Sequence, residues 1–90
     1  TGINNLNIFK IMKQKTFNVV LTGCDSGHKL PVVKAVKENL NLGLKEAKDI
    51  VDTTDKYPVN LKEGVSESEA YKLKKAIEDA GGIVRLDYID

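Results

Sequence analysis

The sequence predicts an α+β domain of the order β-α-α-β-α-β, with three helices packed on one face of a small three-stranded sheet. Apolar residues alternate with a period of two near both ends of this pattern, and they recur at helical spacing in the segments between. Clusters of turn-forming residues separate the segments. The 90 residues suit one small domain, whose modest core must supply most of its stability.

The first strand is expected at residues 17–22, where apolar side chains alternate, and residues 23–28 are expected to form a loop. Before this strand, residues 1–15 contain three lysines and no acidic residue. We therefore expect residues 1–15 to be an N-terminal extension, partly vector-derived or loosely attached over 1–11, and residues 16–90 to be the domain.

Two helices are expected next, at residues 29–39 and from about 44 to 51, because their apolar residues follow a helical period. Pro31 is compatible with the first of these only within its first turn, where a missing N–H is not needed. Gly43 lies between the two helices, and we expect it to supply the turn conformation there.

The second half of the domain is predicted to be strand, helix, strand. Residues 57–61 form a short strand, and Ser66 and Glu69 form a capping box that starts a helix ending before Gly81. Residues 83–88 alternate as a closing strand, with Val84, Leu86 and Tyr88 inward. The predicted core is Phe17, Val19, Leu21, Val33, Val36, Ala47, Val51, Leu61, Leu73, Ile77, Val84 and Leu86.

Composition excludes several classes of function. The net charge is +1, so bulk charge does not favour a nucleic-acid or membrane-surface binder. One cysteine and one histidine allow no internal disulfide and no multi-cysteine zinc site, and they leave few candidates for catalysis. Cys24 and His28 lie in one loop without a third group to orient them, so we expect no catalytic pair there. We expect a non-enzymatic, cytoplasmic protein without cofactor or metal.

Four segments of the sequence carry a resemblance to a known family. They read Lys-Ala-Val-Lys at 34–37, Leu-Gly-Leu-Lys-Glu-Ala-Lys-Asp-Ile-Val at 42–51, Leu-Lys-Glu-Gly-Val at 61–65 and Lys-Lys-Ala-Ile-Glu-Asp-Ala-Gly at 74–81. In order and spacing they resemble the C-terminal domain of the bacterial large-subunit ribosomal stalk protein, the L seven/twelve family, across roughly residues 16–87.

The resemblance implies a β-α-α-β-α-β domain that recruits translational GTPases: elongation factors Tu and G, initiation factor two and release factor three. It places the contact surface on the first two helices. The positions that match this surface are Lys29, Leu30, Pro31, Lys34, Lys37, Gly43, Leu44, Glu46 and Lys48.

Helical spacing independently places part of this surface on the outside. Leu30, Lys34 and Lys37 are spaced i, i+4 and i+7, so they share a face that points away from the apolar stripe. Residues 29–50 hold five lysines against three acidic residues, a local charge of +2, whereas residues 62–79 sum to −1. An apolar residue among lysines suits a weak, fast protein–protein contact.

The sequence also departs from the family pattern. The full-length family protein begins with a helical dimerisation segment and an Ala/Gly-rich hinge, so we expect either an excised domain or, if Met12 is a start, a free-standing relative. Ribosome attachment would then need a segment outside this chain. Pro31 replaces a small residue, Leu40 and Asn41 stand where the family has Thr-Gly, and the region 57–60 is slightly longer.

Two other functions stay open from the sequence. The chain could be an interaction module for a non-ribosomal protein. Alternatively, the two helices joined at Gly43 could act as a helix-turn-helix with Lys45 and Lys48 toward phosphates. Glu46 and Asp49 alternate with those lysines, and the second helix has no Arg, Asn or Gln to read bases, so we expect no direct nucleic-acid contact and no membrane contact.

Overall fold

The predicted order of strands and helices is confirmed in a computed structural model, which describes residues 15–89. The elements are β1 (Thr16–Cys24), α2 (Lys29–Leu40), α3 (Leu44–Thr53), β2 (Val59–Ser66), α4 (Glu67–Asp79) and β3 (Gly82–Ile89). The prediction for residues 1–11 concerns residues outside this range and stays a prediction.

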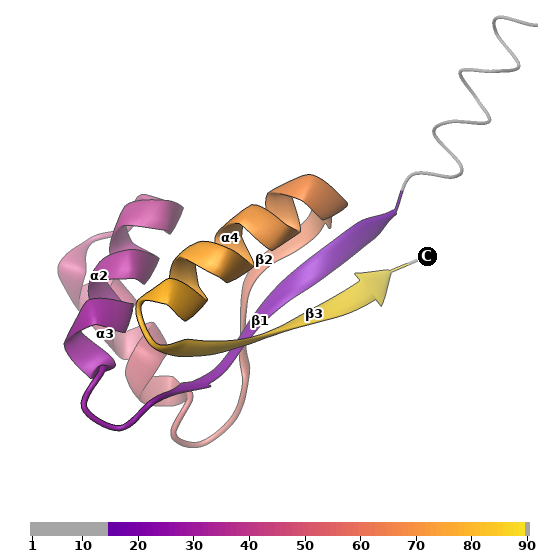
Figure 1. The fold of residues 1–90 in the computed structure, drawn as a ribbon. Coiled ribbons are helices and arrows are strands. Elements are labelled where there is room, and N and C mark those ends of the chain that lie inside the picture. Colours follow the sequence, from indigo (N-terminus) through magenta and orange to yellow (C-terminus); the bar gives the residue numbers. More distant parts are fainter. Residues whose placement is uncertain (1–14, 90) are drawn as a thin grey trace, which may run out of the picture.

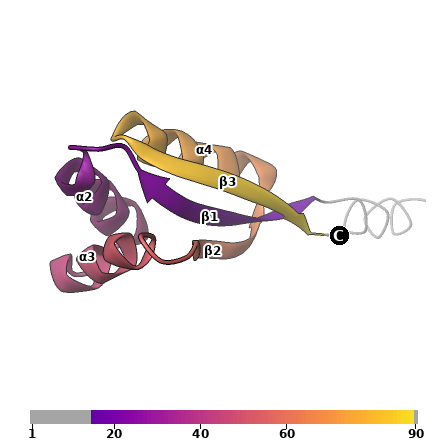
Figure 2. The same cartoon turned by 90° about the horizontal axis from the view of Figure 1, so that it is seen from below.

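The sheet is antiparallel throughout, with β1 between β2 and β3. Helix α4 lies along the sheet, and α2 and α3 pack together beside the end where β1 finishes (Figures 1 and 2). Thr16, the first residue of β1, and Ile89, the last of β3, are paired with each other at the opposite end of the sheet. Within residues 15–89, no helix combines the length and the apolar character that crossing a membrane requires.

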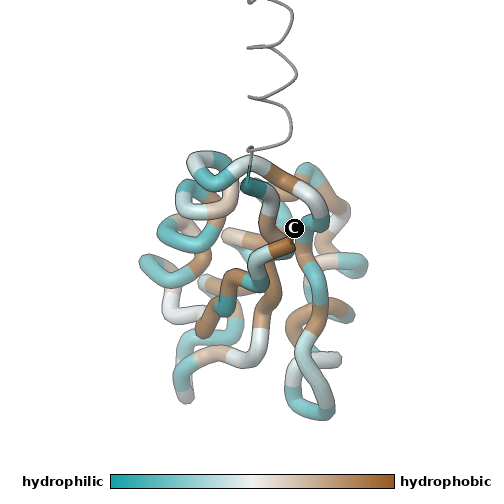
Figure 3. The backbone as a smooth tube through the Cα atoms, turned by 90° about the vertical axis from the view of Figure 1, so that its right-hand side faces the viewer, coloured by the Kyte–Doolittle hydropathy of each residue, from teal (hydrophilic) through white to brown (hydrophobic). Residues whose placement is uncertain are grey.

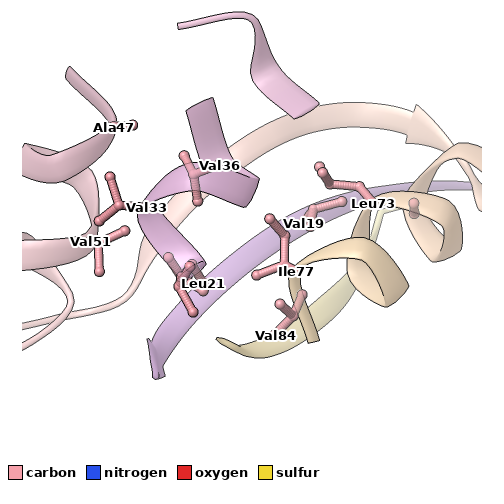
Figure 4. Packing of buried hydrophobic residues seen from close by; sticks show 11 residues of the cluster. Val19, Leu21, Val33, Val36, Ala47, Val51, Leu73, Ile77 and Val84 are labelled. Carbon is pink, nitrogen blue, oxygen red and sulfur yellow. The ribbon is translucent and has the colours of Figure 1, made fainter. Parts of the chain in front are cut away.

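The core joins the sheet to all three helices. Figure 4 shows Val19, Leu73, Ile77 and Val84 packed between β1, α4 and β3, and a second group of buried residues, including Val33, between β1, α2 and α3. In Figure 3, hydrophobic positions gather on the strands and hydrophilic positions lie on the outer turns. The buried hydrophobic residues are Val19, Val20, Leu21, Val32, Val33, Val36, Ala47, Val51, Ala70, Leu73, Ile77 and Val84.

The core differs from the predicted one in a few positions. Phe17, Leu61 and Leu86 pack against the core but stay partly exposed, whereas Val20, Val32 and Ala70 are buried without being in the predicted core. Period-two alternation cannot predict Val20, because it lies on the opposite face of the central strand from its two buried neighbours.

Tyr88 was predicted to point inward, but it is 57% exposed. It does share the helix-covered face, since it pairs with Phe17 in the ladder and the two ring centroids lie 5.5 Å apart. The ring is exposed because it lies close to the open end of the sheet, near the paired residues Thr16 and Ile89.

The link between α2 and α3 corrects the expectation for Gly43. Asn41, not Gly43, adopts the left-handed conformation, with φ at 57°, and its N–H donates to the Lys37 carbonyl to end α2. Asn tolerates this conformation better than most non-glycine residues, so the link does not need a glycine at this position. Gly43 is extended, with φ at −75°, and is the N-cap of α3.

Strand β2 begins later and ends later than predicted. Residues 57–58 precede it in a bend, and the strand runs from Val59 to Ser66. Gly64 has φ at +66°, and its N–H donates to Asn18 Oδ1 at 3.1 Å where the ladder register shifts. Such a bulge hides the alternation on which strand prediction depends. The predicted helix start is confirmed, because Ser66 Oγ accepts from the Glu69 N–H at 3.2 Å, while the Glu69 carboxylate pairs with Lys62 Nζ at 3.3 Å.

The turn before α2 is tied to the turn before β3. The Asp25 N–H donates to the Gly81 carbonyl at 2.8 Å, and the His28 N–H donates to the Asp25 carbonyl at 3.0 Å. Gly81 has φ at +108°, and its Cα faces His28 so closely that an added Cβ would lie 2.5 Å from His28 Cβ. These contacts fix where α2 begins relative to the rest of the domain.

Candidate functional site: an apolar hollow between α2 and α3

A hollow of about 220 Å³ lies between α2 and α3, and five residues line it: Lys29, Leu30, Val33, Leu44 and Lys48. Leu30 is 78% exposed and Leu44 is 62% exposed, so two leucine side chains are presented to solvent at one place. Val33 is only 3% exposed and belongs to the core. The hollow therefore has an apolar lining that continues into the protein interior.

Local sequence rules place these residues on facing helices. Leu30 and Val33 are three apart on α2, and Leu44 and Lys48 are four apart on α3, so each pair shares one side of its helix. Pro31 lies in the first turn of α2, as predicted, where its missing N–H interrupts no helical hydrogen bond. The three-residue link from 41 to 43 keeps the two helices adjacent.

Two lysines of the lining share one carboxylate. Lys29 Nζ forms an ion pair with Asp52 Oδ1, and Lys48 Nζ lies 2.8 Å from Asp52 Oδ2. Asp55 is a more distant partner of Lys29, at 3.9 Å. The hydrogen bond from Lys29, then that from Lys48, lowers the pKa of Asp52 below its ordinary value, while the hydrogen bond to Asp52 raises the pKa of Lys29. The charges of Lys29 and Lys48 are thus partly neutralised.

Three other lysines of α2 and α3 form no ion pair within the described residues. Of these, Lys34 and Lys45 are exposed and Lys37 is half-buried. Lys34 lies one turn after Leu30 on α2. The positive potential of this surface therefore comes mainly from these lysines and less from Lys29 and Lys48.

The structure brings four of the nine sequence-predicted site residues together around the hollow: Lys29, Leu30, Leu44 and Lys48. Pro31, Lys34, Lys37 and Gly43 lie on the same two helices or their link but do not line it. Glu46 lies elsewhere, in an open hollow of about 490 Å³ whose lining includes Asp49, Ile50 and Tyr57. The role of these residues in partner binding stays a prediction.

Sequence reasoning missed two residues of this region. Val33 was assigned only to the core, although it also forms part of the hollow. The second helix was predicted to end at about residue 51, but α3 extends to Thr53 and includes Asp52. The spacing of Lys48 and Asp52, four residues apart, could have indicated their pairing. The contact with Lys29 joins positions 23 residues apart, so no local signal predicts it.

No reactive constellation accompanies the hollow. Cys24 is half-buried at the end of β1, and a His28 ring nitrogen lies 3.2 Å from the Ser26 carbonyl oxygen. Across residues 15–89, His, Cys, Asp and Glu side chains form no group of three that could hold a metal ion. What the hollow can do is accept an apolar side chain of a partner beside ammonium groups.

Fold and hollow together define a class, that of small α+β domains with an exposed apolar hollow between two helices, lined in part by lysines. Residues 17–87 match the family described as Ribosomal protein L7/L12 C-terminal domain, and the chain belongs to this family.

Close relatives carry the name large ribosomal subunit protein bL12. The protein from Flavobacterium psychrophilum is 56% identical over 73 residues, which are 81% of this chain and 57% of the relative. The one from Actinobacillus succinogenes is 53% identical over 70 residues, 78% of this chain and 54% of the relative. The Baumannia cicadellinicola protein is 47% identical across 94% of this chain and 74% of its own length.

The chain spans little more than half the length of the first two of these relatives. The described residues correspond to the C-terminal domain of a ribosomal stalk protein.

Proposed function

We propose that this domain is a non-catalytic docking module of the ribosomal stalk that binds translational GTPases in the cytoplasm. The partners that the sequence resemblance implies are elongation factors Tu and G, initiation factor two and release factor three. The observation that supports the proposal best is the hollow between α2 and α3, with Leu30 and Leu44 exposed beside it. Attachment to the ribosome would be supplied by a segment other than this domain.

The size of the hollow favours a protein partner. At about 220 Å³ it is smaller than the roughly 300–1,000 Å³ of sites that enclose small molecules. It suits a single apolar side chain projecting from a partner surface. A contact with one such anchor is small, and small contacts form weak, transient complexes. Rapid exchange of several factors on one docking site requires such complexes.

Charge supplies the other half of the proposed contact. Lys34, Lys37 and Lys45 are free of ion pairs within residues 15–89, so they can attract an acidic surface of the partner from a distance. Exposed charges mainly raise the rate of association, while the buried apolar anchor limits the rate of dissociation. Leu30 and Leu44 therefore have a different proposed role from the lysines.

The test is a binding titration of this domain with each of the four purified factors at several salt concentrations. Lys34→Glu should slow association with elongation factor G and reduce its salt dependence, at a cost of about 1–2 kcal/mol in binding free energy. Leu30→Ala should instead speed dissociation. The matched control is Lys72→Glu, the same charge change at an exposed side chain of α4 that, like Lys34, forms no ion pair within residues 15–89.

Equal binding by Lys34→Glu and the parent domain would contradict the proposed site. Absence of binding to all four factors would contradict the proposed function. A mobility shift of duplex DNA at physiological salt would favour the helix-turn-helix alternative instead.

A further inference from the structure

We propose that Asp52 is a positioning residue of the hollow, which holds the Lys29 and Lys48 side chains in place along its rim before a partner arrives. This inference rests on the proposed function, because it concerns how the same surface binds. Asp52 does not itself line the hollow. It acts through the two lysines that do.

The contacts join the two helices that form the hollow. Lys29 comes from the first turn of α2, whereas Lys48 and Asp52 are four residues apart on α3. One oxygen of the Asp52 carboxylate pairs with Lys29, and the other lies 2.8 Å from Lys48 Nζ. A single carboxylate thus orders two long side chains that would otherwise sample many rotamers.

Helix dipoles do not explain these charges, although Lys48 and Asp52 also form an i, i+4 ion pair within α3. Lys29 is the first residue of α2, which has no acidic residue in its first turn, and a cation there opposes the helix dipole. Asp52 lies in the last turn of α3, which has no basic residue, and an anion there is also unfavourable. Each charge is at the wrong end of its own helix. Local rules broken in this way are typical of residues kept for function.

Removing the Asp52 charge would have two opposite effects on binding. The domain gains one unit of positive charge, which should speed association with an acidic partner. At the same time Lys29 and Lys48 become free to move, and ordering them again on binding costs free energy. Bulk electrostatics therefore predicts tighter binding, whereas positioning predicts weaker binding. Whether loss of the Asp52 charge strengthens or weakens binding therefore distinguishes bulk electrostatics from positioning.

The experiment measures association and dissociation rates of elongation factor G with three forms of the domain: the parent, Asp52→Asn and Asp49→Asn. Asp49 lies on α3 outside the hollow and its substitution changes the charge equally. Both variants should associate slightly faster than the parent. Only Asp52→Asn should dissociate faster, which makes its net binding weaker by roughly three- to tenfold. Asp49→Asn should bind at least as tightly as the parent.

A second comparison tests whether Asp52 acts through the lysines. In a Lys29→Met, Lys48→Met background, which keeps an unbranched side chain of nearly the same length without charge, adding Asp52→Asn should leave the dissociation rate unchanged. A loss of binding that persists in that background would reveal a structural role and overturn the inference. Equally tight binding by Asp52→Asn and Asp49→Asn would also overturn it. Failure of the parent domain to bind would instead overturn the proposed function, and this inference with it.

Discussion

Substitution of Gly81 by alanine should destabilise the domain more than the same substitution at the glycines whose Cβ position is open, such as Gly64. Gly81 has φ at +108°, a conformation that L residues rarely adopt, which alone costs about 1–3 kcal/mol. An added Cβ would also lie 2.5 Å from His28 Cβ and 2.7 Å from His28 Cγ. A Cβ is fixed by its backbone, so a change of rotamer at His28 cannot relieve the first contact.

The backbone around Gly81 has little freedom to move away. Its carbonyl accepts from the Asp25 N–H at 2.8 Å, and a shift that relieves the Cβ contact would weaken this hydrogen bond. Adding these effects, we expect Gly81→Ala to lower the free energy of unfolding by about 3–4 kcal/mol. That is a large part of the roughly 5–15 kcal/mol typical of a domain.

Gly64→Ala is the matched control, measured by chemical denaturation together with Gly81→Ala. Gly64 also has a positive φ, at +66°, but no atom lies within 4 Å of an added Cβ. Only the conformational cost of about 1–2 kcal/mol should remain. Equal destabilisation by the two substitutions would refute the role assigned to the His28 contact, and would show that the turn before α2 can move.

Three further predictions concern the core, the helix cap and the ion pairs. Leu73→Ala should cost about 2–5 kcal/mol of unfolding free energy in denaturation experiments, because Leu73 lies in the core; a cost below 1 kcal/mol would contradict its placement. Ser66→Ala should cost about 1 kcal/mol and Ser68→Ala much less, since only Ser66 Oγ caps α4. Lys29 and Lys48 lower the pKa of Asp52, so the stability from this carboxylate is present above its ordinary pKa near 3.8 and is lost as pH falls below it. Thermal unfolding of Asp52→Asn should therefore lose less stability than the parent between pH 5 and 2; parallel curves would contradict this.

Local signals in the sequence predicted the elements that depend on local interactions. The cap at Ser66 is an example, because the Glu69 N–H that donates to Ser66 Oγ is only three residues further along the chain. The position of Pro31 is another, since only the first turn tolerates it. Prediction was poorer where contacts between elements distant in the sequence determine the bounds of an element or the burial of a residue. The start of β2 at Val59 depends on its pairing with Leu21, and the burial of Val20 depends on what surrounds the central strand.

The candidate site divides in the same way. The exposure of Leu30 and Lys34 could be predicted from the helical period, because one face of α2 must be buried and the other cannot be. The hollow itself could not be predicted from the sequence, because it is formed only where α2 and α3 pack together. The same holds for the shared carboxylate of Asp52, which pairs with Lys29 on another helix. Geometry between elements is the part that a single sequence leaves undetermined.

The start of β1 and the end of β3 lie far from the hollow. Thr16 and Ile89 are adjacent at one end of the sheet, and α2 follows the other end of β1, whose nine residues span roughly 25–30 Å. A surface, dye or carrier protein coupled through Thr16 or Ile89 would therefore point the α2–α3 side toward bulk solution. Immobilised in this way, the domain offers its leucines to passing molecules without obstruction from its own support.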